Sequence, residues 1–284
     1  MEKIALITDS SCDLPQEIID KYHIHILPLR IIFKDGDFRD RVDITSEEFY
    51  HRLKTEVPTT SMPSVGETWE LFEKLKKDGY THILAILLSD GLSGTFSMVN
   101  GLREKVSELG LAINVINSKA LSLGLGFLVM HAAEGIKNNI PLQTIISKVE
   151  GLISETKVFF VLKTLEYLRK GGRIGLVEGT IGDILDIKPI ISINDEGIYY
   201  SVAKARGRNR SLNRIIEIAK DAVGSRRVYL GVLHGDALED AQYVLDNLKG
   251  DKNLNIAEYF LGQTTASMAV HTGPGLIGIT FCPA

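Results

Sequence analysis

The chain has 284 residues, of which 44% are hydrophobic and 24% charged, a composition typical of folded globular proteins. Its formal net charge of -4 argues against non-specific binding to nucleic acid, so we expect no nucleic-acid partner. Cys12 and Cys282 stand near opposite ends of the chain, which excludes a disulfide framework and suits a reducing compartment.

The N-terminal half alternates short apolar runs with helical patterns. We predict strands over residues 4–9, 25–33, 82–89 and 112–118, helices that begin near Pro15 and Thr45, and further helices over 66–79, 95–110 and 119–156, the last broken near Pro141. Such alternation is typical of βαβ units, so we expect a doubly wound, mostly parallel α/β domain over residues 1–156. Loops that bind ligands follow the carboxyl ends of such strands, which places residues 8–10 and 89–95 at the rim.

The pattern changes in the second half. We predict strands over 157–163, 227–235 and 275–282, a hairpin around the turn 194–197, a short helix at 164–174, and helices over 211–223 and 237–250. This order favours a mixed, largely antiparallel α+β domain over residues 157–284. No linker separates the two domains, so we expect them to pack closely and form a cleft.

The most apolar stretch, residues 120–136, contains His131 and Glu134. It therefore favours a buried helix over a membrane span, which needs about 20 apolar residues. The first ten residues lack the apolar region of a signal peptide. We expect a cytoplasmic protein with no integral membrane segment.

Ser93 lies in Gly91-Leu92-Ser93-Gly94-Thr95, one residue short of the G-x-S-x-G turn that presents a nucleophilic serine. Three interpretations stay open: a nucleophile, a cap for the helix over 95–110, or a hydroxyl that holds a ligand. A nucleophile needs a base and an acid, and Asp183 or Asp236 followed by His271 would supply the required chain order. We favour the ligand-holding hydroxyl because no base and acid are evident beside it.

A second group of hydroxyls, Thr59, Thr60 and Ser61, stands between Pro58 and Pro63. The prolines restrict the backbone, so these side chains suit hydrogen bonding to a polar group, or the segment is only a capping loop before the next helix.

His271 and Thr272 precede a Gly-Pro-Gly turn. A single histidine is more often structural, but in a tight loop it can donate to a carboxylate or phosphate.

Two segments concentrate positive charge. Arg169, Lys170 and Arg173 surround a double glycine, where they either complement a helix terminus or bring a guanidinium to an anion. Five cations follow one another without an acid between residues 204 and 214: Lys204, Arg206, Arg208, Arg210 and Arg214. This second segment is either a solvated strand end or a docking face for an acidic partner protein.

Metal and cofactor motifs are missing from the sequence. Gly273, Gly275 and Gly278 match G-x-G-x-x-G, but they precede an apolar run that predicts a strand, whereas a dinucleotide loop opens a helix. No metal-ligand spacing and no phosphate-binding loop occurs. We expect no metal and no cofactor.

Six short motifs occur in the chain in this order: TDSSCDL, PTTSMPS, LSDGLSGTFS, TLEYLRKGGRI, KPI and HTGPG. Together they make the chain similar to the DegV family of bacterial fatty-acid-binding proteins, essentially from end to end. The resemblance implies a two-domain α/β fold with an acyl chain in a tunnel between the domains and its carboxylate near the surface.

Carried over by position, the resemblance assigns fatty-acid binding to the following residues: Thr60, Ser61, Ser93, Gly94, Arg173, His271 and Thr272. The choice between Arg173 and Arg169 stays open, with Arg173 preferred. The resemblance further implies that a fatty acid kinase catalytic subunit docks near Arg206 and Arg208.

We therefore expect a non-catalytic carrier that binds a long-chain fatty acid and presents its carboxylate to a partner kinase for phosphorylation. Each buried methylene contributes roughly 0.8 kcal/mol, so the tail dominates affinity and the polar residues orient the head. The alternative from another class is a serine hydrolase of the esterase type that uses Ser93 and His271.

Overall fold

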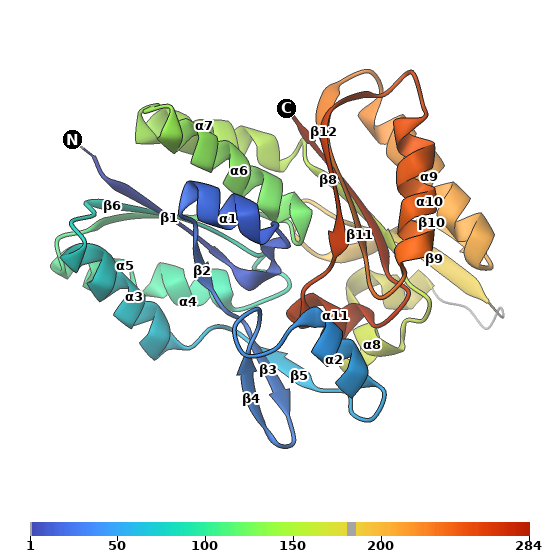
Figure 1. Ribbon diagram of the computed structural model, residues 1–284, viewed down its shortest axis with the longest axis horizontal. Coiled ribbons are helices and arrows are strands. Elements are labelled where there is room, and N and C mark those ends of the chain that lie inside the picture. Colours follow the sequence, from blue (N-terminus) through green and yellow to red (C-terminus); the bar gives the residue numbers. More distant parts are fainter. Residues whose placement is uncertain (1, 181–185) are drawn as a thin grey trace.

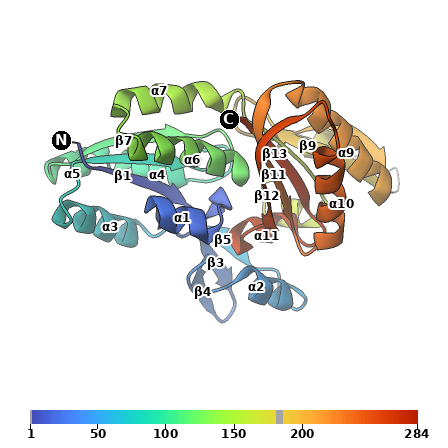
Figure 2. The same cartoon turned by 45° about the horizontal axis from the view of Figure 1, so that its top comes forward.

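The computed structural model describes residues 2–180 and 186–284. Its first sheet is parallel, in the order β2-β1-β6-β7, and consists of β1 (Ile4–Asp9), β2 (His25–Leu27), β6 (His82–Leu87) and β7 (Ala112–Asn117). On one face lie α1 (Gln16–Tyr22), α6 (Leu123–Lys137) and α7 (Leu142–Ile153), and on the other α3 (Val65–Lys77), α4 (Thr95–Gly101) and α5 (Arg103–Glu108) (Figures 1 and 2). Helices on both faces of a parallel sheet confirm the predicted doubly wound arrangement.

Two predicted elements of this half are each divided in the structure. The helix expected over 95–110 is two helices, because Gly101, a poor helix former, ends α4 and Leu102 begins a new turn. The strand expected over 25–33 breaks after β2 at Pro28, which has no N–H to donate to a ladder. Its second part, β3 (Arg30–Phe33), belongs to another sheet.

That other sheet is small and was not predicted. It has three antiparallel strands in the order β4-β3-β5, with β4 (Gly36–Arg39) and β5 (Thr59–Ser61) on either side of β3. Helix α2 (Ser46–Leu53) packs beside it and begins with the expected capping box of Thr45 and Glu48. The sheet projects from the lower side of the molecule in Figure 2 and sets β5, with its hydroxyl residues, against the C-terminal half.

The last sheet has six strands in the order β10-β9-β8-β13-β11-β12. Among its described pairs, only β11–β12 is parallel, as expected for a mixed sheet. Its strands are β8 (Lys157–Val161), β9 (Ile187–Ile193), β10 (Tyr199–Arg206), β11 (Arg227–His234), β12 (Asn255–Gln263) and β13 (Ile277–Pro283). The predicted boundary between residues 156 and 157 falls where β8 begins.

Helices α9 (Arg208–Val223) and α10 (Leu238–Lys249) cover the outer face of this sheet (Figure 1). The described residues also form four short helical segments: η1 (Ser10–Cys12), α8 (Glu166–Lys170), η2 (Gly175–Thr180) and α11 (Ala266–Thr272). Strand β12 and helix α11 were missed from the sequence.

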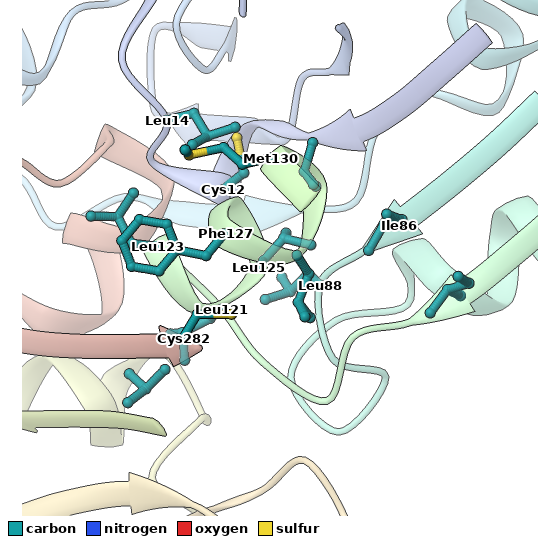
Figure 3. Packing of buried hydrophobic residues seen from close by; sticks show 14 of the residues in the cluster. Cys12, Leu14, Ile86, Leu88, Leu121, Leu123, Leu125, Phe127, Met130 and Cys282 are labelled. Carbon is teal, nitrogen blue, oxygen red and sulfur yellow. The ribbon is translucent and has the colours of Figure 1, made fainter. Parts of the chain in front are cut away.

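The inner face of the six-stranded sheet packs on the N-terminal half through one continuous apolar cluster. Leu123 and Phe127 project from α6 on the side of Cys12 and Leu14, and Leu125 projects toward Leu88 (Figure 3). Glycines keep α6 close to both halves: a Cβ on Gly124 would lie 2.6 Å from Val158 Cγ2, and one on Gly126 would lie 2.6 Å from the carbonyl oxygen of Cys12. The interface between the two sheets is therefore a core and leaves little room for sliding.

Among the helices described, none combines the length and apolarity that crossing a membrane requires.

Candidate functional site

A cavity of about 110 Å³ opens where the loop after β6, strand β5 and helix α11 meet. We call it the polar cavity. It is lined by Leu29, Thr60, Ser61, Met62, Leu88, Leu92, Ser93, Gly94, Leu121, Arg173, Tyr199, Ser267, Met268 and His271. The structure thus brings together every residue assigned to fatty-acid binding except Thr272.

The hydroxyls of this cavity are held by short local contacts. Ser93 Oγ lies 2.9 Å from Thr95 Oγ1 and accepts a longer hydrogen bond, 3.3 Å, from the Thr95 N–H. Thr60 Oγ1 and His271 Nε2 share a hydrogen bond of 2.8 Å. Ser61 donates to the carbonyl of Met62. Ser93 therefore lines the cavity, and it is not the cap of α4: the N-cap residue is Gly94, and no side chain caps this helix.

The His271 ring is neutral at pH 7. Burial, with a smaller contribution from the neighbouring Arg173 guanidinium, lowers the pKa of His271 to about 4. Its Nδ1 has no hydrogen-bond partner among the described residues and faces Gly171, where a Cβ would lie only 2.1 Å away. The ring contributes a polar nitrogen, and the positive charge of the cavity comes from elsewhere.

Arg173 supplies that charge. Its Nη1 donates to the carbonyl of Gly171 at 2.8 Å and its Nε to the carbonyl of Leu92 at 3.3 Å, which fixes the guanidinium plane at the cavity wall. Arg169, by contrast, is half-exposed and its Nε lies 3.7 Å from Glu178 Oε1. The structure places Arg173, not Arg169, at the cavity.

Among the described residues, Ser93 makes no hydrogen bond to His271, and no carboxylate makes one to His271. The hydrogen-bond partner of His271 Nε2 is Thr60, and Gly171 occupies the Nδ1 side where an orienting carboxylate would stand. Asp236 makes no hydrogen bond to His271 in the described part of the chain. Asp183 lies outside the described residues.

A second, smaller cavity of about 30 Å³ shares Leu121, Tyr199 and Met268 with the polar cavity and extends between the sheets. We call it the apolar cavity. Its other lining residues are Ser122, Val158, Phe160, Leu233, Thr264, Thr272, Leu276, Gly278 and Thr280. Thr272 therefore lies away from the polar cavity: it is the last residue of α11, and its hydroxyl donates to the carbonyl of Met268.

Three buried carboxylates hold the surrounding loops. Asp9 Oδ2 accepts from the N–H of Leu88 at 2.8 Å and so fixes the start of the loop that carries Ser93. Asp13 Oδ1 accepts from the N–H of Thr265 at 2.7 Å, at the start of α11. Asp40 Oδ2 accepts from Ser267 Oγ at 2.5 Å, and burial raises the pKa of Asp40 to about 6.

Sequence reasoning missed Ser267, Met268 and Tyr199 as lining residues. Ser267 and His271 stand four residues apart on α11, so both face the cavity. If α11 had been predicted as a helix, Ser267 could have been predicted as a residue that lines the cavity. The Gly-Pro-Gly signal pointed instead to a loop. Tyr199 carries no motif, and only the hairpin register brings it here.

The residues expected to dock a partner differ from each other. Arg206 is exposed at the end of β10. Arg208 is partly buried, and its Nε and Nη2 donate to Asp240 Oδ2 at 2.8 and 2.6 Å. Arg208 thus joins α9 to α10, which leaves Arg206 as the available cation of this pair.

In residues 2–180 and 186–284, no three His, Cys, Asp or Glu side chains come together as metal ligands.

Comparison with known proteins gives a consistent result over the whole chain. A family model described as "Uncharacterised protein, DegV family" matches residues 3–284. A DegV domain-containing protein of Clostridium acetobutylicum is 43% identical over 279 residues, which is 98% of each chain. A DegV family protein of Thermus thermophilus, described as binding fatty acid, has a TM-score of 0.91 at 26% identity over 99% of this chain and 100% of the other. DegV of Bacillus subtilis, described as a fatty acid binding protein, has a TM-score of 0.91 at 30% identity over 100% of both chains.

Proposed function

This chain belongs to the DegV family, and from that premise we propose that it binds a long-chain fatty acid between its two domains. The carboxylate would lie in the polar cavity against Ser93, Thr60 and Arg173. The tail would follow the apolar cavity. The relatives described as fatty-acid binding support the same ligand class for this chain.

One observation carries the proposal: a guanidinium and several hydroxyls line a cavity that shares the wall formed by Leu121, Tyr199 and Met268 with an apolar cavity. Charge-assisted hydrogen bonds suit a carboxylate, and a neutral His271 leaves Arg173 as its counter-charge. A neutral ester would not need the fixed cation, and a sugar would need neither the cation nor the apolar cavity. The arrangement therefore suits an amphiphile with a single negative charge.

The tail must separate the walls of its cavity as it enters. A volume of about 30 Å³ corresponds to roughly one water molecule. Met268 stands at the junction of the two cavities, and methionine is the apolar side chain best able to change shape. We infer that Met268 moves when the tail is bound.

The first test is direct. Lipid extracted from the purified protein should contain a stoichiometric long-chain fatty acid by mass spectrometry, and the delipidated protein should rebind it. Ser93→Ala should weaken binding by about 10- to 100-fold, the loss of one hydrogen bond to a charged group. Absence of both co-purified lipid and measurable affinity would refute the proposal.

A labelling experiment on the purified protein distinguishes the carrier from the hydrolase. A carrier should not react with a fluorophosphonate probe under conditions that label a serine esterase. Stoichiometric labelling at Ser93, lost in Ser93→Ala, would favour the hydrolase instead.

We further propose that the carrier acts in the cytoplasm and presents the bound carboxylate to a fatty acid kinase catalytic subunit. The exposed Arg206 supports a docking face of positive charge. With a kinase subunit, ATP and loaded carrier, Arg206→Glu should reduce acyl-phosphate formation at unchanged fatty-acid affinity. Arg214→Glu is the matched control, since Arg214 lies in the same basic segment but pairs with Glu217. Equal acyl-phosphate formation by the two variants would show that Arg206 is not part of the docking face.

A further inference from the structure

The inner face of the six-stranded sheet carries an unusual row of residues. Leu233 of β11 pairs with Gly262 of β12 on one side and with Gly278 of β13 on the other. Residues in register on neighbouring strands point to the same face of a sheet. Leu233 is thus a single large side chain with no side chain on either neighbour in its row.

Each glycine leaves a hollow, and the two hollows differ. Gly278 lines the apolar cavity, and no atom comes closer than 3.9 Å to a Cβ placed on it. Gly262 lines a different and larger cavity of about 350 Å³, which we call the outer groove. The outer groove is lined by Asp13, Leu14, Pro15, Asp40, Arg41, Ile44, Thr45, Ser46, Leu123, Leu233, Phe260, Leu261, Gly262, Gln263 and Thr265.

Leu233 is the residue that the linings of the apolar cavity and the outer groove share. Its Cδ2 lies 3.4 Å from the position of a Cβ on Gly262, so the side chain leans toward the groove. It is 5% exposed. The wall between the two spaces is therefore one leucine thick at this point.

A polar contact closes the same wall beside Leu233. Asp13, which lines the outer groove, accepts hydrogen bonds from Ser122 at 2.7 Å and from Thr264 at 2.9 Å. Both of these hydroxyl residues line the apolar cavity. The contact fixes the backbone on either side of the wall, so the opening of the wall depends on the leucine.

We propose that Leu233 limits the length of the acyl chain that this protein accepts, by closing the far end of the apolar cavity against the outer groove. This inference rests on the proposed fatty-acid function. Carbons up to the Leu233 side chain are buried and add affinity, and further carbons meet the wall. A shorter side chain at position 233 joins the two spaces and lets a longer chain run into the groove, along Phe260 and Leu261.

The test is the dependence of affinity on chain length, measured on delipidated protein with a homologous series of saturated fatty acids. Each added methylene should tighten binding by about fourfold until the chain meets the wall, and then the affinity should stop rising. Leu233→Ala should move that limit to longer chains. Gly278→Ala, which adds a methyl group inside the apolar cavity without a clash, should move it to shorter chains.

A compensating variant provides the control. Gly262→Leu in the Leu233→Ala background returns a leucine to the same row from the neighbouring strand and should restore the shorter limit. Gly262 has an ordinary φ, so the substitution does not strain the backbone.

The outcomes separate this inference from the function on which it rests. If the unaltered protein binds no fatty acid of any length, the proposed function fails. If it binds but a folded Leu233→Ala keeps the original limit, the role of Leu233 fails alone. Should Leu233→Ala not fold, Gly278→Ala decides: an unchanged limit there overturns the inference.

Discussion

At the residue scale, the polar cavity depends on one fixed charge. The Arg173 guanidinium is held by two backbone carbonyls, those of Gly171 and Leu92, so little side-chain entropy remains to be lost when an anion binds. Its positive charge also helps to lower the pKa of the neighbouring His271 ring, second to the effect of burial. In the proposed binding mode, Arg173 is therefore a preorganised counter-ion for the carboxylate.

Replacement of that charge should weaken carboxylate binding selectively. We expect Arg173→Gln to raise the Kd for a long-chain fatty acid by about 10- to 100-fold, the range for a hydrogen bond to a charged group. Arg169→Gln is the matched control because Arg169 is exposed and pairs with Glu178. Isothermal titration of both delipidated variants checks this, and equal losses would contradict the assignment.

The titration of His271 gives a pH dependence of defined sign. Its pKa of about 4 lies below the ordinary value of 6.5, so below about pH 6.5 the unfolded chain takes up a proton that the folded protein refuses. The stability that the neutral ring provides should be lost as the pH falls from about 6.5 to 4, by up to about 3 kcal/mol.

Urea unfolding of delipidated protein at several pH values measures this effect. The advantage of the unaltered protein over His271→Gln should shrink as the solution is acidified. Asp40, whose pKa burial raises to about 6, is present in both proteins, so its titration cancels in the difference. A difference that stays constant from pH 7 to pH 4 would show that the ring titrates normally.

At the scale of elements, the β9–β10 hairpin reaches from the C-terminal half to the loop that carries Ser93. Ser89 Oγ donates to the carbonyl of Gly197 at 2.9 Å. Gly197 has φ +77°, and a Cβ there would lie 2.0 Å from Ser89 Oγ. Asn194 closes the turn by accepting from the N–H groups of Glu196 and Ile198. Glycine is thus required here by both the backbone and the opposing loop.

Gly197→Ala should therefore destabilise the protein more than the same substitution at a glycine that only needs a positive φ. Gly79 is the matched control, since it has φ +78° and a Cβ placed on it would meet no atom within 4 Å. We expect Gly79→Ala to lower the free energy of unfolding by about 1 kcal/mol and Gly197→Ala by about 2–4 kcal/mol. Only Gly197→Ala should also weaken fatty-acid binding, because it displaces the Ser93 loop. Chemical unfolding and titration of both variants give the comparison.

At the scale of the whole molecule, the sequence predicts the regular parts and misses the irregular ones. The parallel sheet follows from buried strands that alternate with amphipathic helices. Strand β12 was missed because it is a half-exposed edge strand without clean alternation. Helix α11 was missed because it has seven residues and is buried on nearly all sides, so it shows no period.

For the candidate site, too, the sequence predicts one part and misses the other. Short motifs pointed to six of the residues that line the polar cavity, namely Thr60, Ser61, Ser93, Gly94, Arg173 and His271, because each motif is local. The apolar cavity has no motif, since its walls come from strands far apart in sequence, such as those of Val158, Leu233 and Gly278. A motif does not show which cavity each of its residues faces: the neighbours His271 and Thr272 line the polar cavity and the apolar cavity, respectively.

The contact between the two halves should depend strongly on Asp13. Asp13→Ala leaves the hydroxyls of Ser122 and Thr264 and the N–H of Thr265 without their acceptor. We expect a loss of about 3–5 kcal/mol in the free energy of unfolding, as for other broken buried networks. Asp13→Asn should lose less, because its amide oxygen still accepts. Asp246→Ala, at an exposed helix position, should change stability by less than about 0.5 kcal/mol.

The small sheet has a consequence for how a bound molecule leaves. Strand β5 forms part of the wall of the polar cavity, but no residue of β3, β4 or β5 lines the apolar cavity. Outward movement of this sheet would uncover the carboxylate while every wall around the hydrocarbon stayed in place. In the proposed binding mode, exposure of the carboxylate and release of the tail would thus be separate events with separate barriers. The proposed kinase partner would then reach the carboxylate while the acyl tail stayed bound in the apolar cavity.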